Sequence, residues 1–401
     1  MYTRRPSYSS GNGSFRRPSR VNRFRRFGRR ETPAGVVHSF IRRASVKQEI
    51  MSEPTAAMKV CELLISKRLI ENITGRGYID LMPIQEKAIP AILQGKDIIG
   101  IANTGMGKTA AFLIPIIENI IKNPSYHALI ITPTRELALQ IQGEFRQFTK
   151  HIRAYSTFCI GQSSMRNQIY ELRRNPHLVV GTPGRLKDLI ERRILKLSLF
   201  NMIVLDEADR MLDMGFLPDI KHIISFLPQK RQSLFFSATV SQEINRLIQS
   251  FVVNPITISV KTNETVANVR QDVVRIKPGQ TKMDVLQELL GQDEFKKVLV
   301  FGRTKRGVER LSRDLYQKGL KITSIHGDKP QSKRQQAIRM FKEDVVKILV
   351  ATDVAARGLD ISNITHVINY DPPDSYDDYI HRIGRTARAN KEGVALTLIE
   401  E

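Results

Sequence analysis

The sequence predicts an α/β protein with two RecA-like, parallel-sheet domains preceded by a disordered, Arg-rich tail. Short runs rich in Ile and Val, typical of buried strands, alternate with longer stretches whose apolar residues have helical spacing. This alternation indicates repeated βαβ units, and therefore a parallel sheet with helices on both faces. The pattern pauses in the polar stretch 260–272 and then resumes, which indicates two such domains joined by a linker.

The first domain is predicted over residues 56–262, the linker over residues 263–270 and the second domain over residues 271–401. Strands of the first domain are expected at residues 97–102, 127–132, 177–182, 202–206 and 233–239, with helices at 109–122 and 185–195. Strands of the second are expected at 297–304, 321–328, 346–353, 366–371 and 393–400. Ligands of such sheets bind at the carboxyl ends of the strands, so chemically active residues should directly follow the apolar runs.

The chain is strongly basic, and its charge is unevenly distributed. The 401 residues include 63 Lys and Arg against 40 Asp and Glu, a formal net charge of +23. Residues 1–50 contain 12 Arg, one Lys and two acids, hence 13 − 2 = +11. Such an excess indicates an anionic partner, with nucleic acid as the first candidate and an acidic membrane surface as the second.

Residues 1–50 are predicted to form a disordered basic tail. Ser, Gly, Pro, Asn and Arg dominate residues 1–35, which therefore bury too little apolar surface to fold alone. Arg interleaved with Phe15, Phe24 and Phe27 suits single-stranded nucleic acid, through phosphate pairing and base stacking. A solubilising tail without a partner and a transit peptide are the alternatives, although the apolar helical face of a transit peptide is missing.

Cysteine usage and hydropathy bound the cellular setting. Cys61 and Cys159 form neither a disulfide framework nor a metal-ligand set, so a reducing compartment is expected. No apolar stretch approaches the ~18–20 residues of a membrane span. A compact core with an N-terminal Arg-rich arm is compatible with a prokaryotic cytoplasmic protein. The core is expected to be monomeric and to have no membrane partner.

A phosphate-binding loop is predicted between the strand at residues 97–102 and the helix at residues 109–122. The spacing is that of a P-loop, with Ala in place of the usual first Gly. Its glycines let backbone N–H groups close round a phosphate at the helix N-terminus. Lys108 would reach the β- and γ-phosphates, and Thr109 would bind Mg²⁺. The predicted loop consists of Ala102, Asn103, Thr104, Gly105, Met106, Gly107, Lys108 and Thr109.

Three acids cluster at the end of the strand predicted at residues 202–206, in a strongly basic chain: Asp206, Glu207 and Asp209. An acid that ends a strand next to a P-loop strand can hold Mg²⁺, and Asp206 fits that position. Glu207 could then orient or deprotonate the water that attacks the γ-phosphate. The alternative is a solvated helix start or N-cap. Spacing alone gives Asp209 no role.

The motifs and their order resemble those of the DEAD-box ATP-dependent RNA helicases. Residues 206–209 read Asp-Glu-Ala-Asp, and the likeness covers about residues 56–401. It includes "PTRELA" (133–138), "TPGR" (182–185), "SAT" (237–239), "QSKR" (331–334), "ATDVAARGLD" (351–360) and "HRIGRTAR" (381–388). The resemblance implies two RecA-like domains that bind ATP and single-stranded RNA across a cleft. Closure of the cleft would bend RNA and separate short duplexes, and hydrolysis would reopen it.

The resemblance also implies roles for residues round the nucleotide. Gln85 matches the adenine-reading residue of the glutamine motif, here residues 60–85, and Asp360 matches the residue that meets the ribose. His381, Arg382 and Arg385 match the motif that completes the site, and Arg385 corresponds to the arginine finger. A planar, permanently charged guanidinium suits developing charge on the γ-phosphate. The link between hydrolysis and unwinding would join Asp209, Ser237 and Thr239.

RNA contacts implied by the same resemblance lie mostly in the motifs that follow strands. Several fall at expected helix starts, where N–H groups can hold phosphates. Such binding predicts little sequence preference and selection of RNA through its 2′-OH. The structural alternative for any one of these residues is a helix cap. They are Thr134, Arg135, Gly161, Thr182, Gly184, Arg185, Arg334 and Thr352.

The sequence departs from the family pattern at a few positions. Val60 replaces an aromatic residue that would stack on adenine, and Met82 replaces a hydroxyl residue near Gln85. ATP should therefore be preferred over GTP less strictly than in typical members. Gln162 replaces the second Gly of a Gly-Gly turn, so the approach of an RNA backbone there should differ. Typical domains of this kind continue through one more helix after the strand that reaches Glu401.

Three functions fit the sequence. The first is an RNA-stimulated ATPase and helicase, which uses ATP and Mg²⁺. The second is a non-unwinding RNA clamp or annealing factor, in which the Arg-rich tail gathers strands. The third is a DNA helicase or translocase of a related group. The complete and ordered motif set favours the first.

Overall fold

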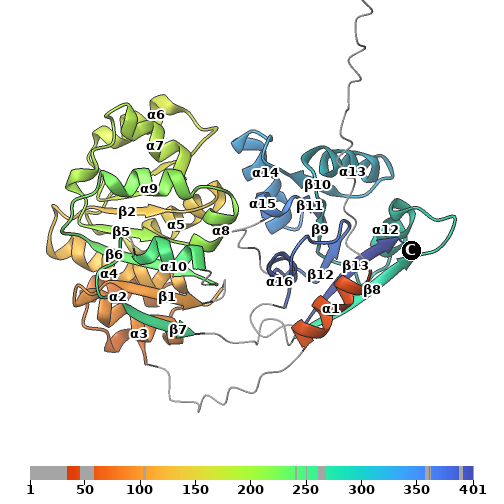
Figure 1. Cartoon of the computed structure of the whole chain (residues 1–401), viewed down its shortest axis with the longest axis horizontal. Coiled ribbons are helices and arrows are strands. Elements are labelled where there is room, and N and C mark those ends of the chain that lie inside the picture. The colour runs from red at the N-terminus through yellow and green to blue at the C-terminus, as the bar shows by residue number, and fades with distance from the viewer. Residues whose placement is uncertain are drawn as a thin grey trace, which may run out of the picture. The chain divides into compact units, whose positions relative to one another are not determined.

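The computed structural model describes residues 34–45, 58–102, 105–239, 242–249, 251–260, 268–356, 361, 363–387 and 392–400. Residues 1–33 and 46–50 of the predicted tail and residues 263–267 of the predicted linker lie outside these ranges. The same is true of the predicted site residues Asn103, Thr104 and Asp360. The described residues form two parallel sheets, each covered by helices on both faces (Figure 1).

The N-terminal domain is built on a seven-stranded sheet with the order β3-β4-β2-β5-β6-β1-β7. Every neighbouring pair of its strands is parallel. The predicted strands are all present, and β3 and β7 extend the sheet at its two edges. The strands are β1 (Ile98–Ala102), β2 (Ala128–Ile131), β3 (Ser156–Cys159), β4 (Leu178–Gly181), β5 (Met202–Leu205), β6 (Gln232–Ser237) and β7 (Ile256–Val260).

Two hydrophobic cores lie on the two faces of this sheet. Because successive side chains of a strand point to opposite faces, Ile130 enters one core while Leu129 and Ile131 enter the other. The first core packs against α2 (Lys67–Thr74), α3 (Pro83–Leu93), α4 (Lys108–Lys122), α5 (Arg135–Phe148) and the 3₁₀ turn Val60–Glu62. The second packs against α6 (Met165–Arg173), α7 (Pro183–Glu191), α8 (Ala208–Asp213), α9 (Leu217–Ser225), α10 (Gln242–Gln249) and the 3₁₀ turn Leu197–Leu199.

The C-terminal domain is built on a six-stranded parallel sheet with the order β10-β11-β9-β12-β13-β8. The strands are β8 (Val269–Ile276), β9 (Val298–Phe301), β10 (Ile322–Ile325), β11 (Ile348–Ala351), β12 (His366–Asn369) and β13 (Gly393–Glu400). One face is covered by α12 (Lys282–Leu290) and α13 (Lys305–Gln317). The other is covered by α14 (Gln331–Lys342), α15 (Asp353–Ala356) and α16 (Tyr376–Ile383). None of the helices in the described ranges is long and apolar enough to cross a bilayer.

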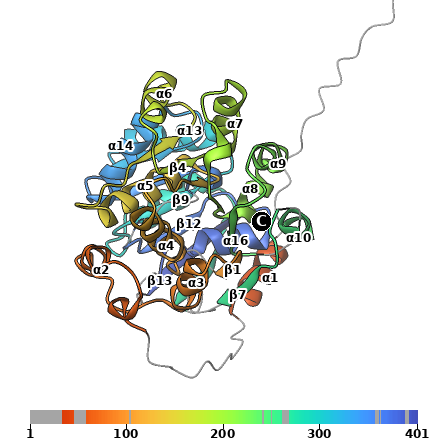
Figure 2. The ribbon, with the colours of Figure 1, turned by 90° about the vertical axis from the view of Figure 1, so that its left-hand side faces the viewer.

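A helix also occupies part of the segment that was predicted to be disordered. Helix α1 (Ala34–Ser45) packs on the C-terminal domain, in contact with α16 and β8 (Figure 1). The perpendicular view also shows α1 next to α16 (Figure 2). Val37, Phe40, Ile41 and Ala44 recur every three or four residues and form one apolar face. Val37 is fully buried, and the other three pack against the core of the domain. The prediction of a tail without structure is therefore wrong for residues 34–45.

Candidate active site

Three neighbouring strands of the N-terminal sheet end in the residues predicted to act on the nucleotide. In the strand order, β6 lies between β5 and β1. β1 leads into the P-loop, β5 leads into Asp206 and Glu207, and β6 ends at Ser237. Because parallel strands have their carboxyl ends at one edge of a sheet, these motifs meet although about a hundred residues separate the first from the second.

The P-loop runs from the end of β1 to the start of α4. Gly105 and Gly107 have φ of 91° and 77°, a left-handed conformation that glycine adopts without steric cost. A Cβ at Gly107 would lie 2.3 Å from Nε2 of Gln85, so any side chain there would collide with it. Nζ of the buried Lys108 donates to the carbonyl of Ala102 at 2.9 Å. The ammonium group of Lys108 is therefore held at the point where β1 ends and the loop begins.

Asp206 is buried where β5 ends. Its Oδ1 accepts a hydrogen bond from the backbone N–H of Glu207 at 3.0 Å. Burial raises the pKa of Asp206 to about 7 against the opposing effect of Lys108, and the carboxylate of Glu207 raises it further. The positive charge of Lys108 does not fully offset the cost of burying the Asp206 carboxylate. A further cation bound next to this carboxylate would therefore be stabilised.

Glu207 is held by a residue that the sequence analysis missed. Its φ of 52° is a left-handed conformation that a residue with a side chain seldom adopts. Its Oε2 accepts a hydrogen bond from a guanidinium N–H of Arg210 at 2.6 Å, and both side chains are buried. A second guanidinium nitrogen of Arg210 lies 3.1 Å from Nδ1 of His381. The one sequence signal for the pair of Arg210 with Glu207 was that Arg210 follows Glu207 by one helical turn.

Asp209 joins the acidic motif to the end of β6. Its Oδ2 accepts hydrogen bonds from the backbone N–H groups of Ala238 and Thr239 at 3.0 Å each, and from the Thr239 hydroxyl at 3.2 Å. The hydroxyl of Ser237 donates instead to the carbonyl of Thr239 at 2.7 Å. The three residues predicted to couple hydrolysis to unwinding are thus brought together, with Asp209 as the acceptor.

Gln85 is tied to the P-loop rather than lining the cavity beside it. Its Nε2 donates to the carbonyl of Gly107 at 3.0 Å, and its Oε1 accepts from the backbone N–H of Met82 at 3.0 Å. The amide retains one further N–H and one lone pair, which adenine recognition would require. Val60, where the family has an aromatic residue, is buried in the core and donates its N–H to the carbonyl of Ile79.

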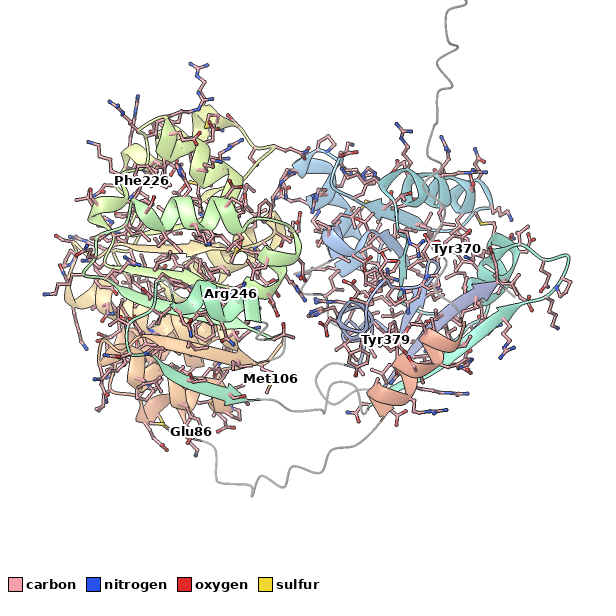
Figure 3. The ribbon with its side chains drawn as sticks, in the orientation of Figure 1. Glu86, Met106, Phe226, Arg246, Tyr370 and Tyr379 are labelled. Carbon is pink, nitrogen blue, oxygen red and sulfur yellow. The ribbon has the colours of Figure 1, made fainter. Side chains whose placement is uncertain are left out.

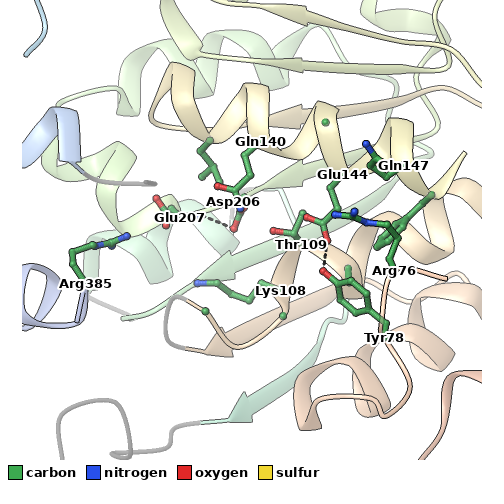
Figure 4. A pocket seen from close by; sticks show the side chains of 16 residues that line it. Arg76, Tyr78, Lys108, Thr109, Gln140, Glu144, Gln147, Asp206, Glu207 and Arg385 are labelled. Carbon is green, nitrogen blue, oxygen red and sulfur yellow. Dashed lines mark hydrogen bonds between the residues drawn. The ribbon is translucent and has the colours of Figure 1, made fainter. Parts of the chain in front are cut away.

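The residues round the P-loop enclose a cavity of ≈ 440 Å³ (Figure 4). Of the predicted residues, those that line it are Gly105, Gly107, Lys108, Thr109, Asp206, Glu207 and Arg385. The cavity extends toward Arg76, Gln140 and Gln147, and toward Tyr78, whose hydroxyl lies 3.0 Å from Oε1 of Glu144. These side chains come from α5 and from the turn after α2, which carry none of the residues predicted to bind the nucleotide. Ala102, Met106, His381 and Arg382 lie outside the lining.

The two arginines predicted to complete the site have different surroundings. Arg385 reaches the cavity, and its Nε donates to the carbonyl of His381 at 3.2 Å. Arg382 is bound within its own domain, with a bidentate contact to Asp353 at 2.5 and 2.7 Å and a further bond to Asn369 at 3.1 Å. Arg382 therefore supports the helix from inside the domain, and its predicted catalytic role stays a prediction.

A second cavity, of ≈ 400 Å³, gathers the residues predicted to contact RNA. It lies at the ends of β2, β3 and β4, which form the other half of the same sheet edge. All of the predicted residues except Thr352 line it: Thr134, Arg135, Gly161, Thr182, Gly184, Arg185 and Arg334. Thr352 directly follows β11 and is buried. The other residues lining this cavity were not predicted to contact RNA: Pro133, Glu136, Met214, Phe216, Gly327 and Val354.

Positive charge is concentrated at this second cavity. Burial lowers the pKa of Arg135, and the nearby guanidinium of Arg334 lowers it further. Arg334 is buried and pairs with Glu136 at 2.6 Å, while its buried Nε has no hydrogen-bond partner among the residues that the structure describes. Gln162, which replaces a glycine of the family, has a φ of 56° and bonds to Arg135 and to the carbonyl of Gly327. This crowding of guanidinium groups favours an anion.

Together, the P-loop, the buried acids beside it and the arginine facing them define a nucleoside-triphosphate hydrolase with RecA-like domains. Two family models match the chain: the DEAD/DEAH box helicase over residues 82–247, and the helicase conserved C-terminal domain over residues 281–390. The chain therefore belongs to the DEAD-box helicase family.

Curated relatives and solved structures agree with this family. The ATP-dependent RNA helicase CshA of Limosilactobacillus reuteri is 48% identical over 346 residues, covering 85% of this chain and 69% of that protein. The DEAD-box ATP-dependent RNA helicase CshA of Geobacillus kaustophilus is 46% identical over 342 residues, covering 84% and 73%. S. cerevisiae Dbp5, bound to RNA and ADP BeF3, aligns with a TM-score of 0.77 at 31% identity, covering 86% of this chain and 90% of its own. Mss116p, bound to single-stranded RNA and AMP-PNP, aligns with a TM-score of 0.78 at 31% sequence identity. The alignment covers 87% of this chain and 76% of the Mss116p chain.

Proposed function

We propose that this ATP-dependent RNA helicase of the DEAD-box type hydrolyses ATP in the P-loop cavity and grips an RNA backbone at the second cavity. Coupling the two would clamp RNA and separate short duplexes locally. The observation that carries the proposal is the division of one sheet edge. The ends of β5, β6 and β1 hold the residues suited to ATP, and the ends of β3, β4 and β2 hold those suited to RNA. Dbp5 and Mss116p were each solved with RNA and a nucleotide, which supports the assignment.

Hydrolysis needs a base, a phosphate-binding cation and a group that meets developing charge. Glu207 would accept the proton of the attacking water. Lys108 would exchange the carbonyl of Ala102 for the β- and γ-phosphates of ATP. Arg385, which lines the same cavity, would meet the charge that develops on the γ-phosphate.

The residues at this site fit Mg²⁺. Thr109 and Asp206 both line the cavity and offer hard oxygen donors. Mg²⁺ usually takes only one or two protein carboxylates and completes its shell with water and phosphate, so a cluster of acids is not required. When bound, the ion would neutralise charge on the phosphates. Asp206→Asn should raise the Mg²⁺ concentration that gives half-maximal ATPase activity.

RNA binding would rest on two helix N-termini at the second cavity. Thr134 is the N-cap of α5, with its hydroxyl accepting the N–H of Leu137 at 3.3 Å, and Thr182 is the N-cap of α7. N–H groups at helix starts hold phosphates, and Arg135 and Arg185 add positive charge. Contacts of this kind carry little base information, so RNA of any sequence should bind, with preference over DNA through the 2′-OH.

Stimulation of the ATPase by nucleic acid tests the proposal. The rate is measured without nucleic acid, with single-stranded RNA, and with DNA of the same sequence. RNA should stimulate strongly and DNA weakly. Equal stimulation by both would favour a DNA helicase or translocase, and no stimulation by either would contradict RNA coupling. Comparing four nucleotides adds a test of Gln85, since equal rates with all of them would exclude base reading.

An annealing activity is a second candidate, because residues 1–50 carry +11 of the net charge. A tail of this composition can gather two RNA strands by neutralising their phosphates. Unwinding and annealing of the same labelled duplex are therefore measured side by side. Annealing that exceeds unwinding in the presence of ATP would favour the clamp or annealing factor over the helicase.

A further inference from the structure

The apolar face of α1 is packed on α16, the helix that carries His381 and Arg382. The ring of Phe40 lies 5.8 Å from the ring of Tyr376 in an edge-on arrangement, and 6.0 Å from the ring of Tyr379. Both tyrosines belong to α16, and Tyr379 lies beside α1 in Figure 3. Aromatic pairs at these distances add to the stabilisation from burial. Phe40 is therefore the central contact between the two helices.

The opposite side of α16 faces the nucleotide machinery. Tyr376, Tyr379 and Ile383 recur at helical spacing, whereas His381 is turned by about 140° from Tyr376 at 3.6 residues per turn. His381 contacts Arg210, and its carbonyl accepts the Nε–H of Arg385. One short helix thus has α1 on one side and the arginine-finger turn on the other.

Helix α16 is also held from β8. The hydroxyl of Tyr379 lies 2.8 Å from Oε1 of Gln271, and Tyr379 is almost fully buried. Helix α1 contacts β8 as well as α16. An eight-residue helix has little stability of its own, so its orientation depends on such packing. Loss of α1 would expose the tyrosine side of α16 and loosen its position.

We propose that α1 is a positioning element for hydrolysis, with Phe40 as a positioning residue that acts through α16 on Arg385. The inference rests on the proposed role of Arg385 as the arginine finger. It extends the catalytic apparatus to a segment that precedes both helicase domains in the chain. Helix α1 has only 12 residues and no acidic residue in its first turn, so packing on the C-terminal domain accounts for most of its stability.

Full-length Phe40→Ala tests the proposal through the split between kcat and KM. RNA-stimulated kcat should fall about threefold to tenfold, the range expected for a residue that acts on a site through packing. KM for ATP and affinity for RNA should be unchanged, because the contacts proposed for them lie elsewhere. Phe40→Tyr, which keeps the ring, should restore the rate. Arg42→Ala is the matched control on the exposed side of α1 and should have wild-type kcat.

A double-mutant cycle separates positioning from loss of folded protein. In an Arg385→Lys background, where the finger geometry is already broken, Phe40→Ala should add no further loss. Equal losses in both backgrounds, or an unchanged kcat in Phe40→Ala, would overturn the inference. Tyr376→Leu removes the same ring contact from α16 and replaces Phe40→Ala in the cycle should that variant unfold. Wild-type activity in Arg385→Lys would instead refute the role proposed for Arg385 itself.

Discussion

Two buried acids, Asp206 and Glu207, follow β5 directly, and each lies next to a different cationic side chain. Asp206 has a raised pKa and lies beside Lys108, which suits the binding of a divalent cation. Glu207 is paired with Arg210, which fixes its carboxylate in one place. The two adjacent acids therefore differ in their charged partners, which is consistent with the different roles proposed for them.

The raised pKa of Asp206 predicts a pH-dependent cost in stability. Between about pH 4 and pH 7 the folded protein retains a proton that the unfolded chain releases, so stability falls as pH rises through this range. Without nucleotide or Mg²⁺, Asp206→Asn should therefore be more stable than wild type at pH 8. Each kcal/mol gained in the free energy of unfolding should raise the unfolding midpoint by about 2–4 °C. The difference should shrink at pH 5. Thermal unfolding at both pH values measures it, and a less stable variant at pH 8 would contradict the account.

Arg210 should matter to the rate through Glu207. Arg210→Gln leaves a buried carboxylate unpaired, so it should lower the free energy of unfolding by about 3–5 kcal/mol. A misplaced base should also lower kcat about 10- to 100-fold. On a Glu207→Gln background the same change should have little further effect on kcat. Lys187→Gln breaks an exposed pair with Asp219 and serves as the control, with wild-type rate expected. An additive loss would assign Arg210 another role.

At the scale of elements, the turn after β5 is tied to the turn after β6 by Asp209. The Oδ2 of Asp209 accepts three hydrogen bonds from the turn after β6, and its Oδ1 accepts the backbone N–H of Arg210. Asp209→Asn leaves one oxygen to accept them and turns an NH₂ donor toward N–H groups on the other side. We expect ATPase activity to persist while unwinding of a short RNA duplex falls about tenfold or more, since charge-assisted bonds of this kind contribute about 1.5–3 kcal/mol each. Parallel loss of both activities would show that Asp209 is not specific to coupling.

The sequence predicted most strands because their Ile and Val runs are buried on both faces of a parallel sheet. The fold class is confirmed, and so is the family. Helix α1 was missed because it directly follows a stretch rich in Ser, Gly, Pro, Asn and Arg, and the composition of the whole tail outweighed the spacing of the apolar residues in α1. Strand β8, with Arg270, Asp272 and Arg275 among its residues, lies at a sheet edge and lacks the continuous apolar run of the others.

Contacts that depend on the folded chain were beyond prediction from pattern. The pair Arg334–Glu136 and the contact Arg210–His381 join residues far apart in sequence, and no local spacing signals them. Gln85 was predicted to read adenine, yet the structure also ties its amide to the backbone of the P-loop. The predicted residues line common cavities because they follow strands that are neighbours in the sheet. Which strands are neighbours cannot be read from their order in the chain.

At the scale of the whole molecule, RNA contacts should be electrostatic and indifferent to sequence. Arg334→Gln should weaken RNA binding about equally for unrelated sequences and reduce the salt slope of the affinity by about 1, the expectation for one lost phosphate contact. Arg313→Gln, exposed on α13, is the control and should leave the slope unchanged. RNA affinities at several salt concentrations measure both. Loss confined to one RNA sequence would indicate base contact instead.

The proposed RNA-stimulated ATPase depends on Glu207 as the general base beside the P-loop. The decisive variant is Glu207→Gln, for which ATP affinity, RNA affinity and ATP turnover are measured on the same protein. ATP and RNA should bind with near wild-type affinity, whereas turnover should be at least about 100-fold slower, since general-base catalysis contributes about 10²–10⁴-fold. Turnover close to that of the wild-type protein would show that Glu207 is not the base.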